Sequence, residues 1–80
     1  LGRKRSANQI GAIADRLSDV RHEQRRYPGA TREVYEKGPG RWQVSDFAVV
    51  TPGQPRKEVA QMLVDDATGH VLKHDPNYKV

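Results

Sequence analysis

The residues with the clearest capacity for chemistry are two histidines near the C-terminus. His70 and His74 are four positions apart, and Asp75 follows the second histidine. On a helix this spacing would place both imidazoles on one face, where they could bind zinc. The surrounding residues, however, predict a strand followed by a tail, in which the two side chains are not held together. We therefore predict that these residues form no metal site.

Two adjacent acids, Asp65 and Asp66, lie in the stretch MLVDDATGHVL (62–72). A calcium loop would need three or more oxygen side chains at alternating positions and a distal glutamate, and that pattern is missing. A turn explains the residues better, because aspartate at its first position accepts a backbone amide and glycine adopts the left-handed backbone at its end. We predict a structural turn made by Asp66, Thr68 and Gly69, with Asp65 accepting amides at the hairpin.

The rest of the chain carries no pattern that indicates catalysis. Ser6, Ser18 and Ser45 have no plausible His/Asp companions in the sequence, and the only Gly-Pro-Gly, at 38–40, has proline where a phosphate loop needs an amide. The chain has no cysteine, which excludes disulfides and thiolate zinc sites. We expect a protein that is not an enzyme and that binds no cofactor and no metal.

The first structural element is expected to be one long amphipathic helix over residues 7–26. Ser6 and Gln9 match a capping box, in which each side chain satisfies a backbone amide of the other residue. Pro28 and Gly29 end the helix. The apolar positions recur at helical spacing and form one stripe for burial; they are Ile10, Ile13, Ala14, Leu17 and Val20.

After the helix the apolar period changes to two, which indicates strands. We expect them at 31–37, 41–50, 57–65 and 70–73, joined by the turn 38–40, the loop 51–56 and the turn described above. Strict alternation along the second strand would bury Asp46 and expose Phe47, so we predict a bulge at Ser45–Asp46. The short connections predict an α+β fold, with one N-terminal amphipathic helix packed on a three- to four-stranded antiparallel meander. Leu17 and Trp42 are expected to meet in its core.

The positive charge of this 80-residue chain is concentrated in its first third. The net charge is +4, and residues 1–26 contain seven Lys and Arg against three Asp and Glu. We expect residues 1–5 to be a basic flexible arm, 6–73 to be one domain and 74–80 to be a tail. A basic block can contact nucleic acid or anionic lipid, or be solvated. Tyr27, Tyr35 and Arg32 could stack on bases, but aromatic residues are few, so we expect nucleic-acid binding to be weak.

Much of the chain resembles a PepSY domain. The features that carry the resemblance are the alanine-containing helix IGAIADRL, the strand sequence WQV and the ending MLVDDATGHVL. The ending is similar to the V-D-x-x-T-G-x-V-L pattern of that family; the matching residues are Val64, Asp65, Thr68, Gly69, Val71 and Leu72. The basic start GRKR departs from the acidic character usual in the family.

The resemblance implies a non-catalytic module that inhibits, chaperones or holds a neighbouring domain. It also implies a bacterial parent protein that is extracytoplasmic or membrane-anchored, although no run here approaches the roughly 20 apolar residues of a membrane span. The partner would be a protein or an adjacent domain of the parent chain. Candidate contact residues are Trp42, Tyr35, Arg25 and Arg26. For Trp42 the alternative is a place in the core, against Ile13 and Leu17.

Overall fold

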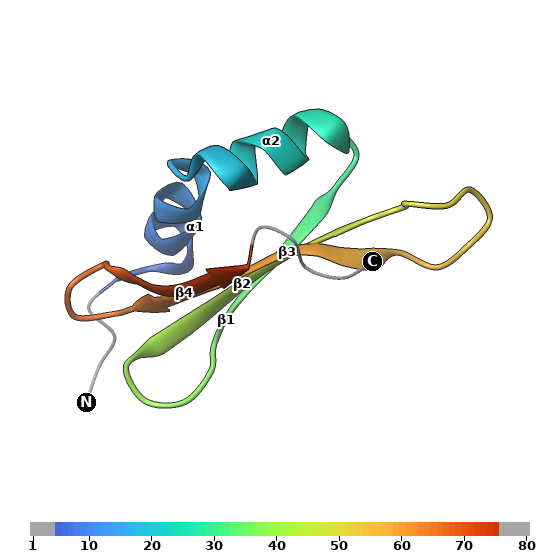
Figure 1. Ribbon diagram of the computed structural model, residues 1–80. Coiled ribbons are helices and arrows are strands. Elements are labelled where there is room, and N and C mark those ends of the chain that lie inside the picture. Colours follow the sequence, from blue (N-terminus) through green and yellow to red (C-terminus); the bar gives the residue numbers. More distant parts are fainter. Residues whose placement is uncertain (1–4, 76–80) are drawn as a thin grey trace.

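The computed structural model describes residues 5–75, apart from the side chains of Asp19, His74 and Asp75, and has a helical layer on one face of a sheet (Figure 1). The helices are α1 (Ala7–Asp15) and α2 (Ser18–Arg26). The strands are β1 (Thr31–Glu36), β2 (Arg41–Ala48), β3 (Lys57–Asp65) and β4 (Val71–Asp75), and they form one antiparallel sheet in the order β1-β2-β3-β4. The predicted α+β class and the meander are confirmed.

The helical layer begins with the predicted capping box. The Gln9 amide donates to Ser6 Oγ over 3.2 Å, and the Ser6 amide donates to Gln9 Oε1 over 2.8 Å. Two of the amides that a helix start leaves without a partner are thereby satisfied.

The prediction of one continuous helix over 7–26 is wrong, because the chain breaks between α1 and α2. Leu17 has an extended backbone, with ψ of 129°. The two helices contact different strands: α1 lies against β1 and β2, whereas α2 lies against β3. Strands in a sheet are rotated relative to one another, so a straight helix would leave the sheet surface. The break at Leu17 lets Val20 on α2 join Ile10 and Ala14 on α1 in the core.

The core lies between the helices and the sheet. Its buried members are Ile10, Ala14, Val20, Trp42, Val44, Met62 and Val64. Trp42 is the largest fully buried side chain. Leu17 is only half-buried and packs against this cluster together with Ile13, Val34 and Val71. Residues of the predicted helix stripe are thus used in the core, together with Met62 and Val64 of β3.

The predicted bulge in β2 is on the neighbouring strand instead. The ladder of β1 and β2 runs without interruption through Ser45 and Asp46. The register shift lies between β2 and β3, where Asp46 pairs with Ala60, Phe47 pairs with Glu58, and Val59 is the additional residue. Asp46 therefore stays on the helix-facing side of the sheet and is buried.

The ends of the domain also differ from the predicted limits. Arg5, expected in the flexible arm, is attached to the domain because its amide donates to Asp66 Oδ1 over 3.0 Å. Strand β4 continues to Asp75, two residues beyond the expected end of the domain at residue 73. Residues 1–4 of the predicted arm and 76–80 of the predicted tail lie outside the described residues.

The turn glycine Gly69 provides a test of the hairpin. Its φ is +77°, a conformation that costs alanine more than glycine. We expect Gly69→Ala to lower the free energy of unfolding by about 1 kcal/mol or more, measured by urea denaturation. Gly29→Ala is the matched control, since Gly29 lacks this constraint and a Cβ there would meet nothing within 4 Å. Equal urea midpoints of unfolding for Gly69→Ala and Gly29→Ala would contradict the assignment of Gly69 to a left-handed turn position.

Candidate functional site

The two adjacent acids lie in different surroundings, Asp65 in a surface turn and Asp66 beside the core. Asp65 Oδ2 accepts the Thr68 amide over 2.9 Å and the Thr68 hydroxyl over 2.8 Å. Thr68 Oγ1 accepts the His70 amide over 3.1 Å, and the Gly69 amide donates to the Asp65 carbonyl over 2.8 Å. The predicted turn is present, but its carboxylate belongs to Asp65 and not to Asp66. The hydrogen bonds from Thr68 lower the pKa of Asp65 below its ordinary value.

Asp66 is buried, with 5% of its surface exposed. Its Oδ1 accepts the indole Nε1 of Trp42 over 2.9 Å and the Arg5 amide over 3.0 Å. The Arg5 guanidinium donates to the Asp66 carbonyl, and the Asp66 amide donates to the Gly40 carbonyl over 2.9 Å. Trp42 is only 2% exposed. The prediction of Trp42 as a partner contact therefore fails in this conformation, and its alternative, a place in the core, holds.

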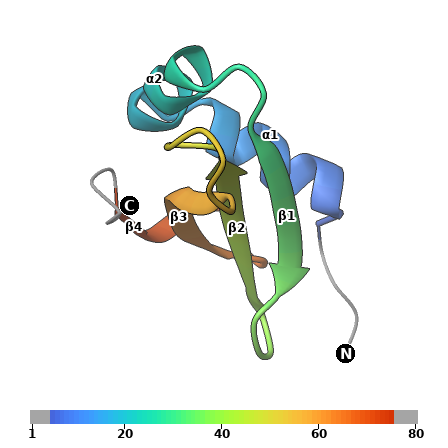
Figure 2. The ribbon, with the colours of Figure 1, turned by 90° about the vertical axis from the view of Figure 1, so that its right-hand side faces the viewer.

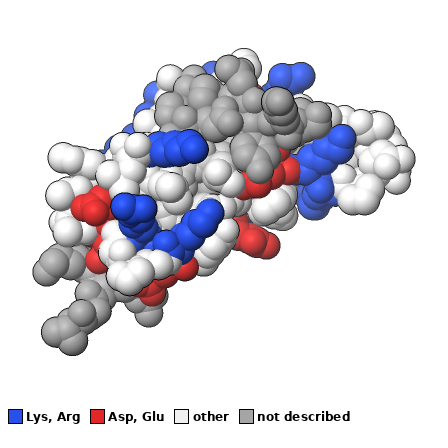
Figure 3. All heavy atoms as spheres, turned by 60° about the horizontal axis from the view of Figure 1, so that its bottom comes forward, with Lys and Arg blue, Asp and Glu red and all other residues white. Residues whose placement is uncertain are grey.

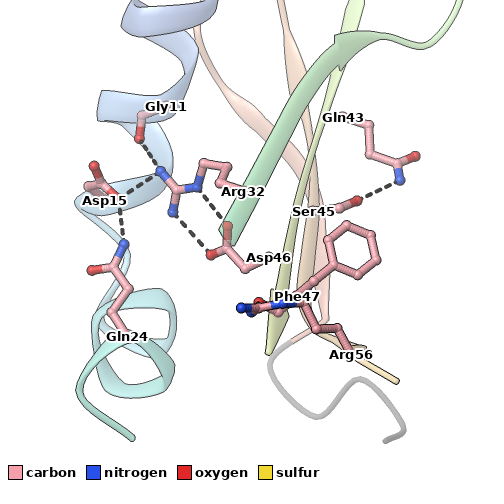
Figure 4. A network of polar contacts seen from close by, with 9 residues as sticks. All are labelled: Gly11, Asp15, Gln24, Arg32, Gln43, Ser45, Asp46, Phe47 and Arg56. Carbon is pink, nitrogen blue, oxygen red and sulfur yellow. Dashed lines mark hydrogen bonds and ion pairs between the residues drawn. The ribbon is translucent and has the colours of Figure 1, made fainter. Parts of the chain in front are cut away.

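A second polar network joins α1 to the sheet through Arg32 (Figure 4). Arg32 forms two hydrogen bonds to Asp46, of 2.7 Å from Nε and 3.1 Å from Nη2. Its Nη1 donates to the Gly11 carbonyl over 3.2 Å and to Asp15 Oδ1 over 2.8 Å. The hydrogen bond to Asp46 raises the pKa of Arg32 above its ordinary value, against the effect of burial. The Arg32 guanidinium therefore holds α1 and β2 to β1, and these contacts leave it unavailable to a ligand.

The three residues proposed to stack on nucleic-acid bases are not brought together. Arg32 is held by the two carboxylates just described. The ring of Tyr27 is covered by the Arg26 guanidinium, whose carbon lies 5.4 Å from the ring centroid. Tyr35 is on β1, three positions from Arg32, so it points to the opposite face of the sheet. In the view of Figure 3, the basic and acidic groups of the described residues are interspersed and form no single positive stripe.

The face of the sheet opposite the helices is not covered by any described element (Figure 2). We call it the uncovered face. One row of paired residues crosses it: Tyr35, Gln43, Leu63 and Lys73. Tyr35 is 42% exposed, and Leu72, an additional residue in the register of β4, is 50% exposed. Gln43 is buried; its Nε2 donates to Ser45 Oγ over 2.9 Å, while its Oε1 has no hydrogen-bond partner among the described residues.

The other predicted contact residues, Arg25 and Arg26, lie in the exposed last turn of α2. Arg26 and Arg56 line a groove of about 290 Å³ at the end of the helical layer. Sequence reasoning missed Arg56, because its loop gave no sign that it would lie beside α2. The predicted contacts thus fall on two surfaces, with Tyr35 on the uncovered face and Arg26 at the groove.

The described residues contain no group of three or more His, Cys, Asp or Glu arranged to hold a metal ion. His70 is exposed at the hairpin, while the side chain of His74 lies outside the described residues. No helix in this part of the chain is long and apolar enough to span a membrane.

Comparisons with protein-family models, curated proteins and solved structures find no match for this chain. The resemblance to PepSY domains therefore stays a prediction that depends on the quoted residues.

The Asp65–Thr68 contact provides a prediction about pH. A lowered carboxyl pKa contributes stability above the unfolded-state pKa, and this contribution is lost as pH falls through the folded-state pKa. We expect Thr68→Val to remove the hydroxyl donor and to raise the pKa of Asp65 toward its ordinary value. NMR titration of the Asp65 carboxyl carbon measures the change. Thr51→Val, in the exposed β2–β3 loop, is the control and should leave the titration unchanged. An unaltered Asp65 pKa in Thr68→Val would contradict the hydrogen-bond assignment.

The Arg32 network provides a prediction about stability. Arg32→Met leaves the buried Asp46 carboxylate without its cation, and breaking a buried pair in this way costs about 3–5 kcal/mol. Asp15→Asn removes only the exposed partner, whose side chain is 51% exposed, and should cost less than about 1 kcal/mol. Urea unfolding of both variants measures the difference. Similar losses would mean that Asp46 does not depend on Arg32.

Proposed function

We propose that this chain is a non-catalytic protein-interaction or regulatory module of the PepSY kind, which binds a partner protein or an adjacent domain of its parent chain. The observation that carries the proposal is the uncovered face of the sheet. Exposed tyrosine is typical of protein interfaces, because its ring is large, rigid and amphipathic. Tyr35 near one edge provides an apolar contact on this face, with Leu63 half-buried beside it. Leu72 near the other edge is half-exposed, and alternation after the core-facing Val71 puts it on the same face.

The polar centre of this face fits the same role. The Oε1 atom of Gln43 is a buried acceptor without a described partner, and such atoms are uncommon in native proteins. A protein that packs on the row of Tyr35, Gln43 and Leu63 and displaces the groups that bury Gln43 could supply the missing donor. The exposed Lys73 at the end of the row would remain at the polar rim of the interface.

The cellular setting that we propose follows from the resemblance alone. A PepSY-like module would belong to an extracytoplasmic or membrane-anchored bacterial protein and would inhibit, chaperone or hold its neighbour. The alternative function, nucleic-acid binding through residues 2–26, is supported by the basic start of the sequence. It receives little support from the geometry, because Arg5 in this segment is engaged with Asp66, and Arg32, which was expected to stack on bases, is engaged with Asp46.

Site-specific photocrosslinking in the native host tests the proposal. A photoreactive residue placed at Tyr35 or at Leu72 should yield the same protein adduct, because Tyr35 lies on the uncovered face and alternation after the core-facing Val71 puts Leu72 there too. The same residue at Arg21, exposed on α2, is the matched control and should not yield it. An identical adduct from Arg21 would contradict the assigned surface. Adducts to nucleic acid alone would favour the alternative function.

A further inference from the structure

The groove between the end of α2 and the β2–β3 loop has the construction of a binding site. Four parts of the chain line it: the end of α2, the turn that follows, the end of β2 and the β2–β3 loop. Its residues are Arg26, Tyr27, Pro28, Gly29, Ala30, Ala48, Val49 and Arg56. Ala48 is paired with Lys57 and lies at the end of the helix-facing side of β2, so the groove is separate from the uncovered face.

Both cations of the groove are positioned by contacts within the domain. Arg56 Nη1 donates to the Gly29 carbonyl over 3.2 Å and to the Phe47 carbonyl over 3.5 Å; Figure 4 draws Arg56 beside Phe47. The Arg26 guanidinium lies over the ring of Tyr27. These contacts occupy Nη1 of Arg56 and one face of the Arg26 guanidinium. The other N–H groups of the two guanidinium planes keep the donor geometry that matches a carboxylate.

The charged and the apolar lining residues of the groove indicate which ligand would match it. Among the described residues, two arginines and no acidic residue line it, whereas the polar hollow beside α1 pairs its Arg32 with Asp15 and Asp46. Between the arginines, the lining residues Pro28, Ala30, Ala48 and Val49 are apolar. Val49 is 47% exposed and has no described element over it. A matching ligand therefore has an anionic group next to an apolar one.

We propose that this groove binds an acidic side chain and a neighbouring apolar side chain from an extended segment of a protein partner. This groove proposal rests on the proposed function in one respect only, which is that the partner is a protein. A nucleic-acid strand fits less well, because single-strand binders offer several aromatic faces to the bases, whereas the groove offers one ring, Tyr27, of which Arg26 already covers one face. A volume of about 290 Å³ suits one or two side chains, since it is at the low end of ligand pockets.

An NMR titration with two matched peptides tests the proposal. The ¹⁵N-labelled chain is titrated with acetyl-Glu-Leu-Glu-amide and, separately, with acetyl-Gln-Leu-Gln-amide. We expect the acidic peptide alone to shift the amide signals of Gly29, Ala30 and Val49, and its affinity to fall with rising salt. Equal responses to both peptides, or acidic-peptide shifts spread over other basic residues, would overturn the proposal.

Charge-removing variants locate the site. Arg56→Gln and Arg26→Gln should each weaken binding of the acidic peptide by about tenfold or more, the effect of losing a charge-assisted hydrogen bond. Arg21→Gln removes the same charge from α2 outside the groove and should leave the affinity within about twofold. Val49→Asp, at an exposed position, should abolish binding by repulsion. If one of the arginine variants fails to fold, Val49→Asp still tests the site. Unchanged binding of the acidic peptide to Val49→Asp would overturn the proposal.

Two further results separate this site from the proposed function. A single-stranded oligonucleotide that shifts the groove signals when the acidic peptide does not would assign the groove to nucleic acid and overturn the proposal. Failure of the peptide to bind, together with protein adducts from Tyr35 and Leu72, would overturn the groove alone. Failure of both experiments would overturn the groove and the protein-interaction function together.

Discussion

The architecture depends on the ion pair between Arg32 and Asp46. Asp46 projects into the side of the sheet on which the helices pack, where an unpaired carboxylate would be costly. Arg32 lies directly opposite it on β1 and reaches past it to the Gly11 carbonyl and to Asp15 on α1. The same guanidinium therefore fixes the register of β1 against β2 and the position of α1 on the sheet. A one-residue slip of β1 would turn Arg32 to the uncovered face and leave Asp46 unpaired.

A similar arrangement closes the other end of the core. Asp66 is buried beside Trp42, and Arg5 donates to it from the segment that precedes α1. In both places a buried aspartate is held by an arginine that its position in the sequence would assign to the surface. Asp46 is held through its carboxylate by the Arg32 guanidinium, whereas Asp66 is held through its backbone carbonyl by the Arg5 guanidinium and through its carboxylate by the Arg5 backbone amide. The excess positive charge of the chain is thus partly used to hold the domain together. Arg26 and Arg56 differ, because the groove that they line has no acidic residue in the part of the chain that the structure describes.

The parts of the fold that depend on local chemistry were predictable, and those that depend on distant partners were not. The capping box of Ser6, the left-handed Gly69 and the limits of β3 follow from neighbouring residues. The break at Leu17 depends on the twist of the sheet beneath the helices, and the burial of Asp66 depends on the position of Trp42. The Arg32–Asp46 pair had a signal in the sequence. Counting outward in pairs from the 38–40 turn places residue 32 opposite residue 46, which would have explained the buried carboxylate without a bulge in β2. The groove had no comparable signal, because Arg56 reaches Gly29 only through the tertiary fold.

The residues that carry the PepSY resemblance have mostly structural roles in this hairpin. Val64 and Val71 pack in or against the core, Asp65 and Thr68 form the turn, and Gly69 supplies its positive φ. A sequence under selection for the same hairpin would retain these five residues whatever its partner. Leu72 differs, because it follows the core-facing Val71, has no partner in the register of β3 and is half-exposed. Neither the turn nor the core requires a leucine there. Leu72, which alternation after the core-facing Val71 puts on the side of Tyr35, is therefore the residue of the motif that neither the turn nor the core accounts for.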